Sequence, residues 1–392
     1  MSFKRLFSKA LAAAPGRLHF AAHSHHLWPD ASFDGHMQAW TDGIELADTK
    51  WDKVFSEVIP EAQGHVCREL GLPNPAEIVF SSNTHDFLIR LLSALPGRPV
   101  RVLTTDGEFH SLRRQAARWE EAGDAVVTRV PLEPRDTLAD RFLAEAGKGG
   151  HDLIVVSHVF FRAGLIFERV AELAALARPE GPWVLLDGYH GFMAVETDLS
   201  PAADRLFYVG GGYKYAMAGE GAAFLRAPRG FGERPVLTGW FAEFGDLQGP
   251  PGGVGYTTDG GRFWGATFDP SGLYRFNAVR RMLDAEGLTT AAVSAHADGL
   301  MARFEQAVRS GEAGPLADAE ILNPTGPGPH ARFLALRHPQ AQGWKKTLLA
   351  HGVVTDVRDD VIRFGFGLYQ DAADVAALTA ACRRVLTQGD PR

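Results

Sequence analysis

Short runs of strand-forming residues alternate with helical patterns through the middle of this chain, and this alternation limits the possible folds more than any other feature. The runs predicted to be strands are residues 101–104, 125–130, 152–157, 182–186, 206–210 and 222–225. Between two of them, Val170, Leu173, Ala174 and Ala177 recur at helical spacing, as a crossover helix packed on a sheet requires. The sequence therefore predicts an α/β fold with a mostly parallel sheet, in which ligands bind just beyond the carboxyl ends of the strands.

The alternation stops in the second half of the chain. Sequence rich in glycine and proline covers residues 249–261, and after Ser271 the chain becomes helical, then short-stranded, then helical again. At 392 residues, the chain is long enough for one large domain and a smaller one. We predict a large domain at residues 46–268 and a smaller α+β domain at residues 269–392. The first 45 residues are expected to pack on the smaller domain or on a partner subunit.

The charge balance gives no indication of a nucleic-acid or membrane partner. The formal net charge is −7 at pH 7, and the sequence contains no run of about 18 apolar residues. We therefore expect a cytoplasmic protein with a small-molecule partner. Two cysteines, Cys67 and Cys382, are too few for a disulfide framework. We expect Cys382 in the core, on the apolar stripe of a C-terminal helix with Val375, Leu378, Val385 and Leu386.

A lysine in a glycine-rich turn is the sharpest chemical feature. Residues 210–215 read Gly-Gly-Gly-Tyr-Lys-Tyr and follow a predicted strand, so Lys214 has room for a bulky group beside its amine. Schiff-base chemistry needs that amine deprotonated, which burial and nearby positive charge promote. A lysine after glycines is, by itself, more often a solvated loop residue. The assignment of Lys214 therefore depends on its neighbours.

A carboxylate follows the apolar strand that precedes this turn. Asp187 stands there, with His190 three residues further on. A carboxylate at this place can pair with the pyridine nitrogen of pyridoxal 5'-phosphate (PLP) and keep it protonated, so that the ring accepts electrons from a substrate carbanion. His190 would reach the cofactor ring or its O3' oxygen. The alternative is that Asp187 caps a helix and His190 is a packed polar residue.

Polar and aromatic residues after two further strands complete the predicted cofactor site. Asn83 and Thr84 stand at the start of a predicted helix, where free backbone N–H groups suit a phosphate, although a plain helix cap has the same pattern. Phe109 and His110 are candidates to stack on the pyridine ring, whereas an isolated aromatic residue here would usually be core.

Taken in order, these residues resemble the class V aminotransferase group of fold-type I PLP enzymes, and within that group the kynureninases. The resemblance covers most of the chain. The motifs that carry it are the strand-Asp-x-x-His of residues 187–190, Tyr-Lys-Tyr at 213–215, Gly-Trp at 239–240, Arg-Phe-x-x-x-Thr at 262–267, and Asp-Val-Ile-Arg at 360–363 followed by Leu-Tyr at 368–369.

The resemblance implies a large domain with a seven-stranded sheet, and it assigns roles to particular residues. Lys214 would carry PLP as a Schiff base and Asp187 would meet the pyridine nitrogen, with His190, Asn83, Thr84 and Tyr213 around the ring and phosphate. Arg363 would bind the α-carboxylate of an amino-acid substrate, because its planar fork suits a bidentate carboxylate pair. Trp240, Tyr256 and Thr267 correspond to positions that reach the phosphate or the substrate, partly across a dimer interface. We therefore expect a homodimer with its active sites at the interface.

Departures from the kynureninase pattern concern the substrate. Residues 22–29 read Ala-His-Ser-His-His-Leu-Trp-Pro where the family has Gly-Asn-Ser-Leu-Gly-Leu, which places His23, His25 and His26 near the expected active-site mouth. Ile44 stands in place of a histidine for the aromatic ring of kynurenine, and Leu112 in place of an aspartate. A metal site from the three histidines lacks a clear carboxylate partner, so we predict no metal. We expect His23, His25 and Tyr256 to contact the substrate.

Several functions remain open on the sequence alone. The first is a kynureninase-like hydrolase or lyase that cleaves a side-chain bond of a β-substituted amino acid, starting with removal of the Cα proton by Lys214. The second is a class V aminotransferase with the same parts. Cysteine desulfuration is disfavoured because neither cysteine lies in a plausible mobile catalytic loop. A catalytically silent PLP-binding protein is a further alternative, against which Lys214, Asp187 and Arg363 argue.

Overall fold

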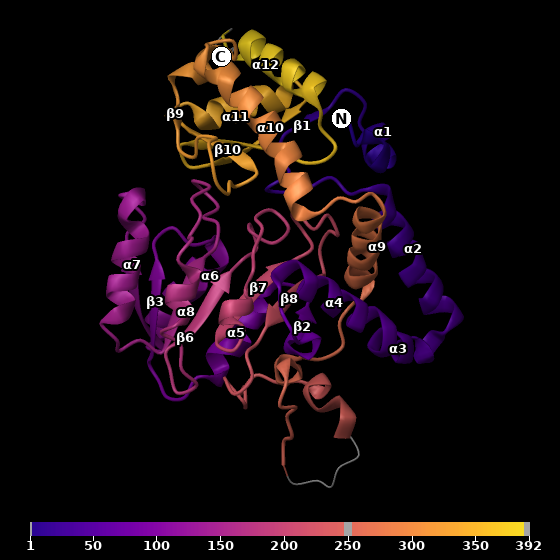
Figure 1. The fold of residues 1–392 in the computed structure, drawn as a ribbon, viewed down its shortest axis with the longest axis vertical. Coiled ribbons are helices and arrows are strands. Elements are labelled where there is room, and N and C mark those ends of the chain that lie inside the picture. Colours follow the sequence, from indigo (N-terminus) through magenta and orange to yellow (C-terminus); the bar gives the residue numbers. More distant parts are fainter. Residues whose placement is uncertain (1, 247–252, 388–392) are drawn as a thin grey trace.

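A seven-stranded sheet forms the centre of the larger part of the molecule (Figure 1). The computed structural model describes residues 2–246 and 253–387. The sheet order is β2-β8-β7-β6-β5-β3-β4, and within it only β8 runs against the other strands. The strands are β2 (Ile78–Ser81), β3 (Val100–Thr105), β4 (Ala125–Val130), β5 (Leu153–Ser157), β6 (Trp183–Asp187), β7 (Leu206–Gly211) and β8 (Ala223–Arg226). The predicted α/β fold with a mostly parallel sheet is confirmed.

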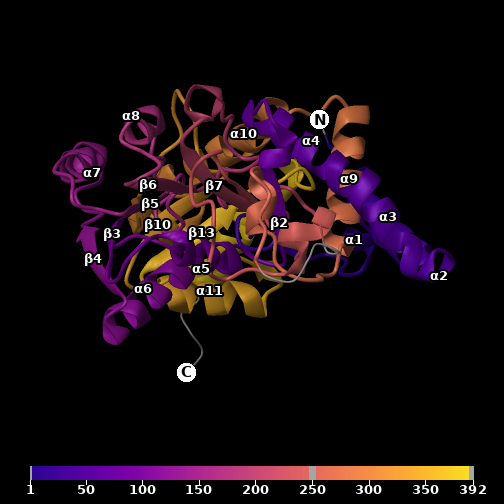
Figure 2. The ribbon, with the colours of Figure 1, turned by 90° about the horizontal axis from the view of Figure 1, so that it is seen from below.

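The central strands are continuous apolar runs because helices cover both faces of the sheet. Helices α5 and α6 lie on one face, and α7 and α8 lie on the other (Figure 2). Their bounds are α5 (Thr84–Ala94), α6 (His110–Ala122), α7 (Leu138–Gly147) and α8 (Val170–Ala174). The predicted crossover helix is thus α8, which is only one turn long. Its apolar stripe continues beyond its end, since Ala177 is also buried.

A layer of helices flanks the edge of the sheet that carries β2. It contains α2 (Asp30–Glu45), α3 (Lys50–Lys53), α4 (Ile59–Leu70) and α9 (Ser271–Ala285). Helices α2 and α9 pack side by side at the right of Figure 1. Gly35 permits this close packing, because a Cβ atom there would lie 2.6 Å from the carbonyl oxygen of Tyr274.

The C-terminal part of the chain has its own sheet and its own core. Its four-stranded antiparallel sheet has the order β12-β13-β10-β9. The elements are α10 (Thr290–Arg309), β9 (Glu320–Ile321), β10 (Phe333–Arg337), α11 (Ala341–Ala350), β11 (Val353–Val354), β12 (Asp356–Arg358), β13 (Val361–Gly365) and α12 (Ala372–Leu386). All five residues of the stripe predicted on the C-terminal helix are buried on α12, which confirms the core position of Cys382.

The first residues of the chain are built into this C-terminal part. A short helix, α1 (Ser8–Ala12), precedes β1 (Leu18–His19), which pairs in parallel with β11. The next residue, Phe20, is fully buried in the core formed by α10, α12 and the small sheet. The division at residues 45 and 268 stays a proposal, because α9 follows residue 268 yet packs on α4 of the large domain.

In the described part of the chain, no helix combines the length and the apolar character needed to cross a membrane.

Candidate active site

The glycine-rich turn after β7 buries Lys214 in the centre of the molecule. A Cβ atom at Gly211 would lie 2.9 Å from the hydroxyl oxygen of Tyr189, so the glycine lets the strand pass close to that ring. Lys214 is 7% exposed, and its Nζ donates a hydrogen bond to Nε2 of His190 at 2.8 Å. The same Nζ lies 4.6 Å from the ring centroid of Tyr189 and 5.3 Å from that of Phe109. The lysine is therefore not a solvated loop residue.

Burial changes the protonation of this lysine. Desolvation lowers the pKa of Lys214 from 10.5 to about 7, although the carboxylate of Asp187 opposes the shift. Burial also holds the pKa of His190 well below its usual value, so the imidazole beside Lys214 is neutral. Near neutral pH, a large share of Lys214 is consequently the free amine, which is the nucleophilic form.

Asp187 ends β6, where it is half-buried. The backbone N–H of Tyr189 donates to Oδ1 of Asp187 at 3.0 Å. Burial raises the pKa of Asp187, while this hydrogen bond and the charge of Lys214 oppose the rise. Asp187 lines one cavity together with Thr84 and Phe109. Three residues that the sequence assigned to the cofactor therefore meet in a single hollow at the carboxyl edge of the sheet.

The start of α5 lies on this cavity. Asn83 caps the helix, since its Oδ1 accepts a hydrogen bond from the backbone N–H of Asp86 at 3.0 Å. The helix-cap interpretation of Asn83 is thus what the structure shows, and Thr84 is the residue that lines the cavity. The free N–H groups of the first turn of an eleven-residue helix suit an anion at this place.

The two aromatic candidates lie side by side at the start of α6. The Phe109 ring stands edge-on to Phe161, with their centroids 5.3 Å apart. His110 lies beside both rings, and its Nδ1 is 3.1 Å from a guanidinium nitrogen of Arg113. Of the two, Phe109 lines the cavity with Asp187, which makes it the better stacking surface.

Arg363 is buried at the centre of β13, and its fork is already engaged. The residue is 1% exposed. One guanidinium nitrogen forms an ion pair with Asp356, which faces it across the β12–β13 pairing, and the other donates to the carbonyl oxygen of Phe161. Burial lowers the pKa of Arg363 to about 10, so the guanidinium remains charged at neutral pH. The ring of Phe333 lies 5.6 Å from its central carbon.

The three histidines of the N-terminal segment point in different directions. His23 is fully buried and stacks on Phe333 at 4.7 Å, with its Nε2 3.8 Å from Oδ2 of Asp356. His25 is exposed and stands edge-on to Tyr213 at 5.3 Å. His26 contacts Tyr369 on the far side of the loop. In residues 2–246 and 253–387, no group of three or more His, Cys, Asp or Glu side chains could hold a metal ion.

Four sequence-predicted positions lie away from this centre within one chain. The segment that carries Trp240, Tyr256 and Thr267 extends from the end of the large part opposite the C-terminal sheet (Figure 1). The hydroxyl of Tyr256 donates to the carbonyl oxygen of Pro235 at 2.7 Å, and Thr267 is exposed. Ile44 is 60% exposed near the end of α2. The place of Ile44 in a substrate pocket therefore stays a prediction, since within one chain its side chain points outward from α2.

Two acidic residues at the site were missed in the sequence. Glu108 is buried and accepts hydrogen bonds from the hydroxyls of Thr105 at 2.7 Å and Ser157 at 2.5 Å, and burial raises its pKa to about 7. Its position directly before Phe109 was the available signal. Asp356 could have been found from the hairpin pattern, because a short turn at residues 359–360 places it opposite Arg363.

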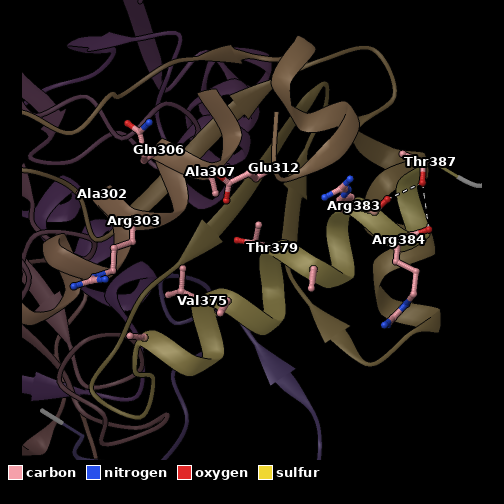
Figure 3. A pocket seen from close by; sticks show the side chains of 13 residues that line it. Ala302, Arg303, Gln306, Ala307, Glu312, Val375, Thr379, Arg383, Arg384 and Thr387 are labelled. Carbon is pink, nitrogen blue, oxygen red and sulfur yellow. Dashed lines mark hydrogen bonds between the residues drawn. The ribbon is translucent and has the colours of Figure 1, made fainter. Parts of the chain in front are cut away.

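A broad hollow of about 1040 Å³ lies elsewhere, between α10 and α12 (Figure 3). Its lining combines small side chains such as Ala302 and Ala307 with charged ones such as Arg303, Glu312 and Arg383. No residue predicted for the active site lines it. The cavity at Asp187, rather than this hollow, is therefore the candidate active site.

Solved structures of PLP enzymes have the same fold as this chain. A cystine C–S lyase superposes with a TM-score of 0.81 at 16% sequence identity, covering 96% of this chain and 99% of the lyase. A cysteine desulfurase from Thermococcus onnurineus NA1 gives 0.78 at 18% identity, covering 99% and 100%. The chain therefore has the predicted fold of the fold-type I PLP-dependent transferases.

Sequence comparison then narrows the relationship. Residues 293–381 match the family model of the kynureninase C-terminal domain, which confirms the predicted resemblance for that part of the chain. An isopenicillin N epimerase from Streptomyces clavuligerus is 31% identical over 220 residues, which are 53% of each chain. The chain thus spans about half the length of the curated relative that it matches.

Proposed function

We propose that the chain is a PLP-dependent enzyme that acts on a β-substituted amino acid and cleaves a bond in its side chain, as a hydrolase or a lyase. The observation that carries this proposal is the buried amine of Lys214, whose pKa is lowered to about 7 beside Asp187. An amine of this kind is suited to forming a Schiff base and to moving a proton near neutral pH.

The residues around the cavity fit PLP. Phe109 offers an aromatic face, Asp187 offers a carboxyl group for the pyridine nitrogen, and the start of α5 at Thr84 offers N–H groups for the phosphate. Lys214 would hold the cofactor covalently. When bound, PLP supplies an electron sink for the carbanion left after loss of the Cα proton.

The remaining steps belong to the protein's own side chains. Arg363 would bind the α-carboxylate of the substrate, which fixes the Cα–H bond relative to Lys214. The free amine of Lys214 would then take that proton, while His190 holds Nζ at 2.8 Å. His23 and His25 flank the site from the N-terminal loop, so we propose that they meet the distal group of the substrate.

The state of the two cysteines argues against a desulfurase, which takes sulfur from its substrate on a cysteine thiolate. Both cysteines are buried, and burial raises the pKa of Cys67 to about 11 and that of Cys382 to about 12. Neither therefore provides a thiolate near neutral pH to take sulfur from a substrate. The match to the kynureninase C-terminal domain further favours hydrolytic or eliminative cleavage.

We also propose that the enzyme is a homodimer with its active sites at the interface. Phe33, Met37, Trp40 and Ile44 form an exposed apolar stripe at helical spacing along α2, and Trp40 is 60% exposed. Stripes of this kind usually pack against another surface. We propose that a second copy of the chain covers this stripe, since the resemblance gives Trp240, Tyr256 and Thr267 roles that reach partly across a dimer interface.

The proposal is tested by locating the cofactor and the products. Borohydride reduction of the purified holoenzyme should attach the cofactor to Lys214, and Lys214→Ala should abolish the adduct. Lys148→Ala, at an exposed lysine paired with Glu145, is the matched control and should retain it. A reducible adduct that persists in Lys214→Ala would exclude Lys214 as the carrier.

A panel of β-substituted amino acids, including L-kynurenine, then separates the reactions. Cleavage releases the side chain and leaves alanine or pyruvate, whereas an aminotransferase yields a keto acid that retains the side chain. We expect release of the side chain. L-Kynurenine should be a weak substrate, because histidines replace the family residues at the mouth of the site.

A further inference from the structure

The guanidinium group of Arg363 is held by a carboxylate of the same chain. Asp356 forms an ion pair with Arg363 through Oδ2, and its Oδ1 accepts a hydrogen bond from Arg358 Nη1 at 2.7 Å. One carboxylate therefore lies between two guanidinium groups. The pairing is fixed by the strands, because Asp356 on β12 stands directly opposite Arg363 on β13.

This arrangement leaves one unbalanced positive charge beside the site. Two arginines and one aspartate carry a net charge of about +1, because arginine does not lose its proton in proteins. His23 adds no charge, since burial and the neighbouring Arg363 hold its pKa well below the usual value. The next acidic residues along the turn, Asp359 and Asp360, have solvent-exposed side chains that contact Arg162, so water and salt screen their charges from the buried cluster. One carboxylate from a ligand would therefore neutralise the cluster.

The cluster also has free hydrogen-bonding capacity. Within the described residues, Nε of Arg363 and both ring nitrogens of His23 are buried without a hydrogen-bond partner. Buried polar groups are seldom left unsatisfied. A ligand carboxylate at Nε of Arg363 would satisfy that donor while Asp356 stays in place. A second carboxylate nearby would face Asp356 with no cation left to balance it.

We propose that Asp356 is a specificity-determining residue that restricts the site to amino acids carrying a single carboxylate. This inference rests on the proposed function, in which Arg363 receives the α-carboxylate. Asp356 neutralises one of the two positive charges of Arg358 and Arg363. A substrate whose distal group is also anionic is therefore disfavoured. Two like charges at short range in a buried site cost enough to change relative affinity by about tenfold or more.

The test uses two probes that cannot undergo the reaction. Propionate and succinate are titrated into the purified holoenzyme by isothermal calorimetry at pH 8, where both are fully ionised. Wild type should prefer propionate. Asp356→Asn should raise the affinity for succinate relative to propionate by about tenfold, because the neutral amide leaves a second positive charge free. Asp360→Asn removes the same charge from the exposed turn and should leave the ratio as in wild type.

A second variant keeps the proposal falsifiable if Asp356→Asn folds poorly. Arg358→Gln leaves one arginine for one aspartate, so both probes should bind about tenfold more weakly. Affinities in Arg358→Gln equal to those of wild type would overturn the proposal. So would an unchanged ratio in a folded Asp356→Asn, or a wild type that binds neither probe. If borohydride attached no cofactor to Lys214 in the wild type, the proposed function would be refuted. The calorimetric ratio tests Asp356 independently of that result.

Discussion

Replacing Lys214 by methionine should stabilise the cofactor-free protein. Methionine fills a similar volume without a charge, whereas the lysine must either be buried as an ammonium or give up its proton on folding. The pKa of Lys214 is about 7 in the folded protein, against 10.5 when solvated. Below pH 7, Lys214 is protonated in both the folded and the unfolded protein, so burial of the charge lowers the folding stability by its full amount.

The size of the effect follows from this difference in pKa. Each unit corresponds to about 1.4 kcal/mol, so the lysine costs roughly 4 kcal/mol of folding free energy at pH 7. The unfolded chain binds more protons than the folded one between pH 7 and 10.5, so this cost declines as the pH rises. At pH 9.5 roughly 1 kcal/mol remains. The stability gap between Lys214→Met and wild type should therefore shrink by roughly 3 kcal/mol over that interval.

The assay is urea unfolding at pH 7 and pH 9.5, on protein freed of cofactor with hydroxylamine. Only the gap between variant and wild type is interpreted, because other groups titrate alike in both proteins. Lys148→Met, at an exposed lysine, is the control and should show a gap near zero at both pH values. A gap for Lys214→Met that does not change with pH would refute the argument that Lys214 is a buried amine with a lowered pKa.

Two further predictions concern the cofactor partner and the dimer. Asp187→Asn should still bind PLP but lose several kcal/mol of transition-state stabilisation, on the order of a hundredfold or more in kcat, because an amide pairs weakly with a protonated ring nitrogen. Unchanged kcat would remove Asp187 from the mechanism. Trp40→Glu places a charge in the apolar stripe of α2 and should shift the protein from dimer to monomer in sedimentation velocity, while Asp34→Asn on the same helix should not. A monomeric wild type would contradict the proposed interface.

The strands and the chemical centre were predictable because each depends on a local pattern. Continuous apolar runs identify strands buried on both faces, and β6 ends at the carboxylate where the sequence predicted a ligand site. Lys214 and Asp187 were predicted as cofactor residues because few other residue types perform Schiff-base and pyridine chemistry. The position of Asp187 follows from the neighbouring strands, since it pairs with Ser157 and Val209.

The parts that the sequence did not reveal depend on tertiary contacts. Neighbouring histidines look equivalent in a sequence, yet His23 packs on Phe333 and His26 packs on Tyr369 because the loop turns between them. The resemblance places Ile44 where kynureninases have a histidine, but only the packing of α2 on α9 shows that its side chain is exposed within one chain. The ion pair of Arg363 with Asp356 could be predicted only by knowing which residue stands opposite Arg363 in the hairpin.

The pairing of β1 with β11 has a consequence for how the protein is made. The backbone of Phe20 is bonded to both Val354 and Gly365, and its ring fills the C-terminal core. On a ribosome, this first strand emerges long before its partners, and it remains exposed while the central sheet is already able to form. The later-translated strand β11 therefore completes a layer begun by β1. Until Val353 and Val354 have been made, β1 lacks the strand with which it pairs, and Phe20 lacks the C-terminal core in which it is buried.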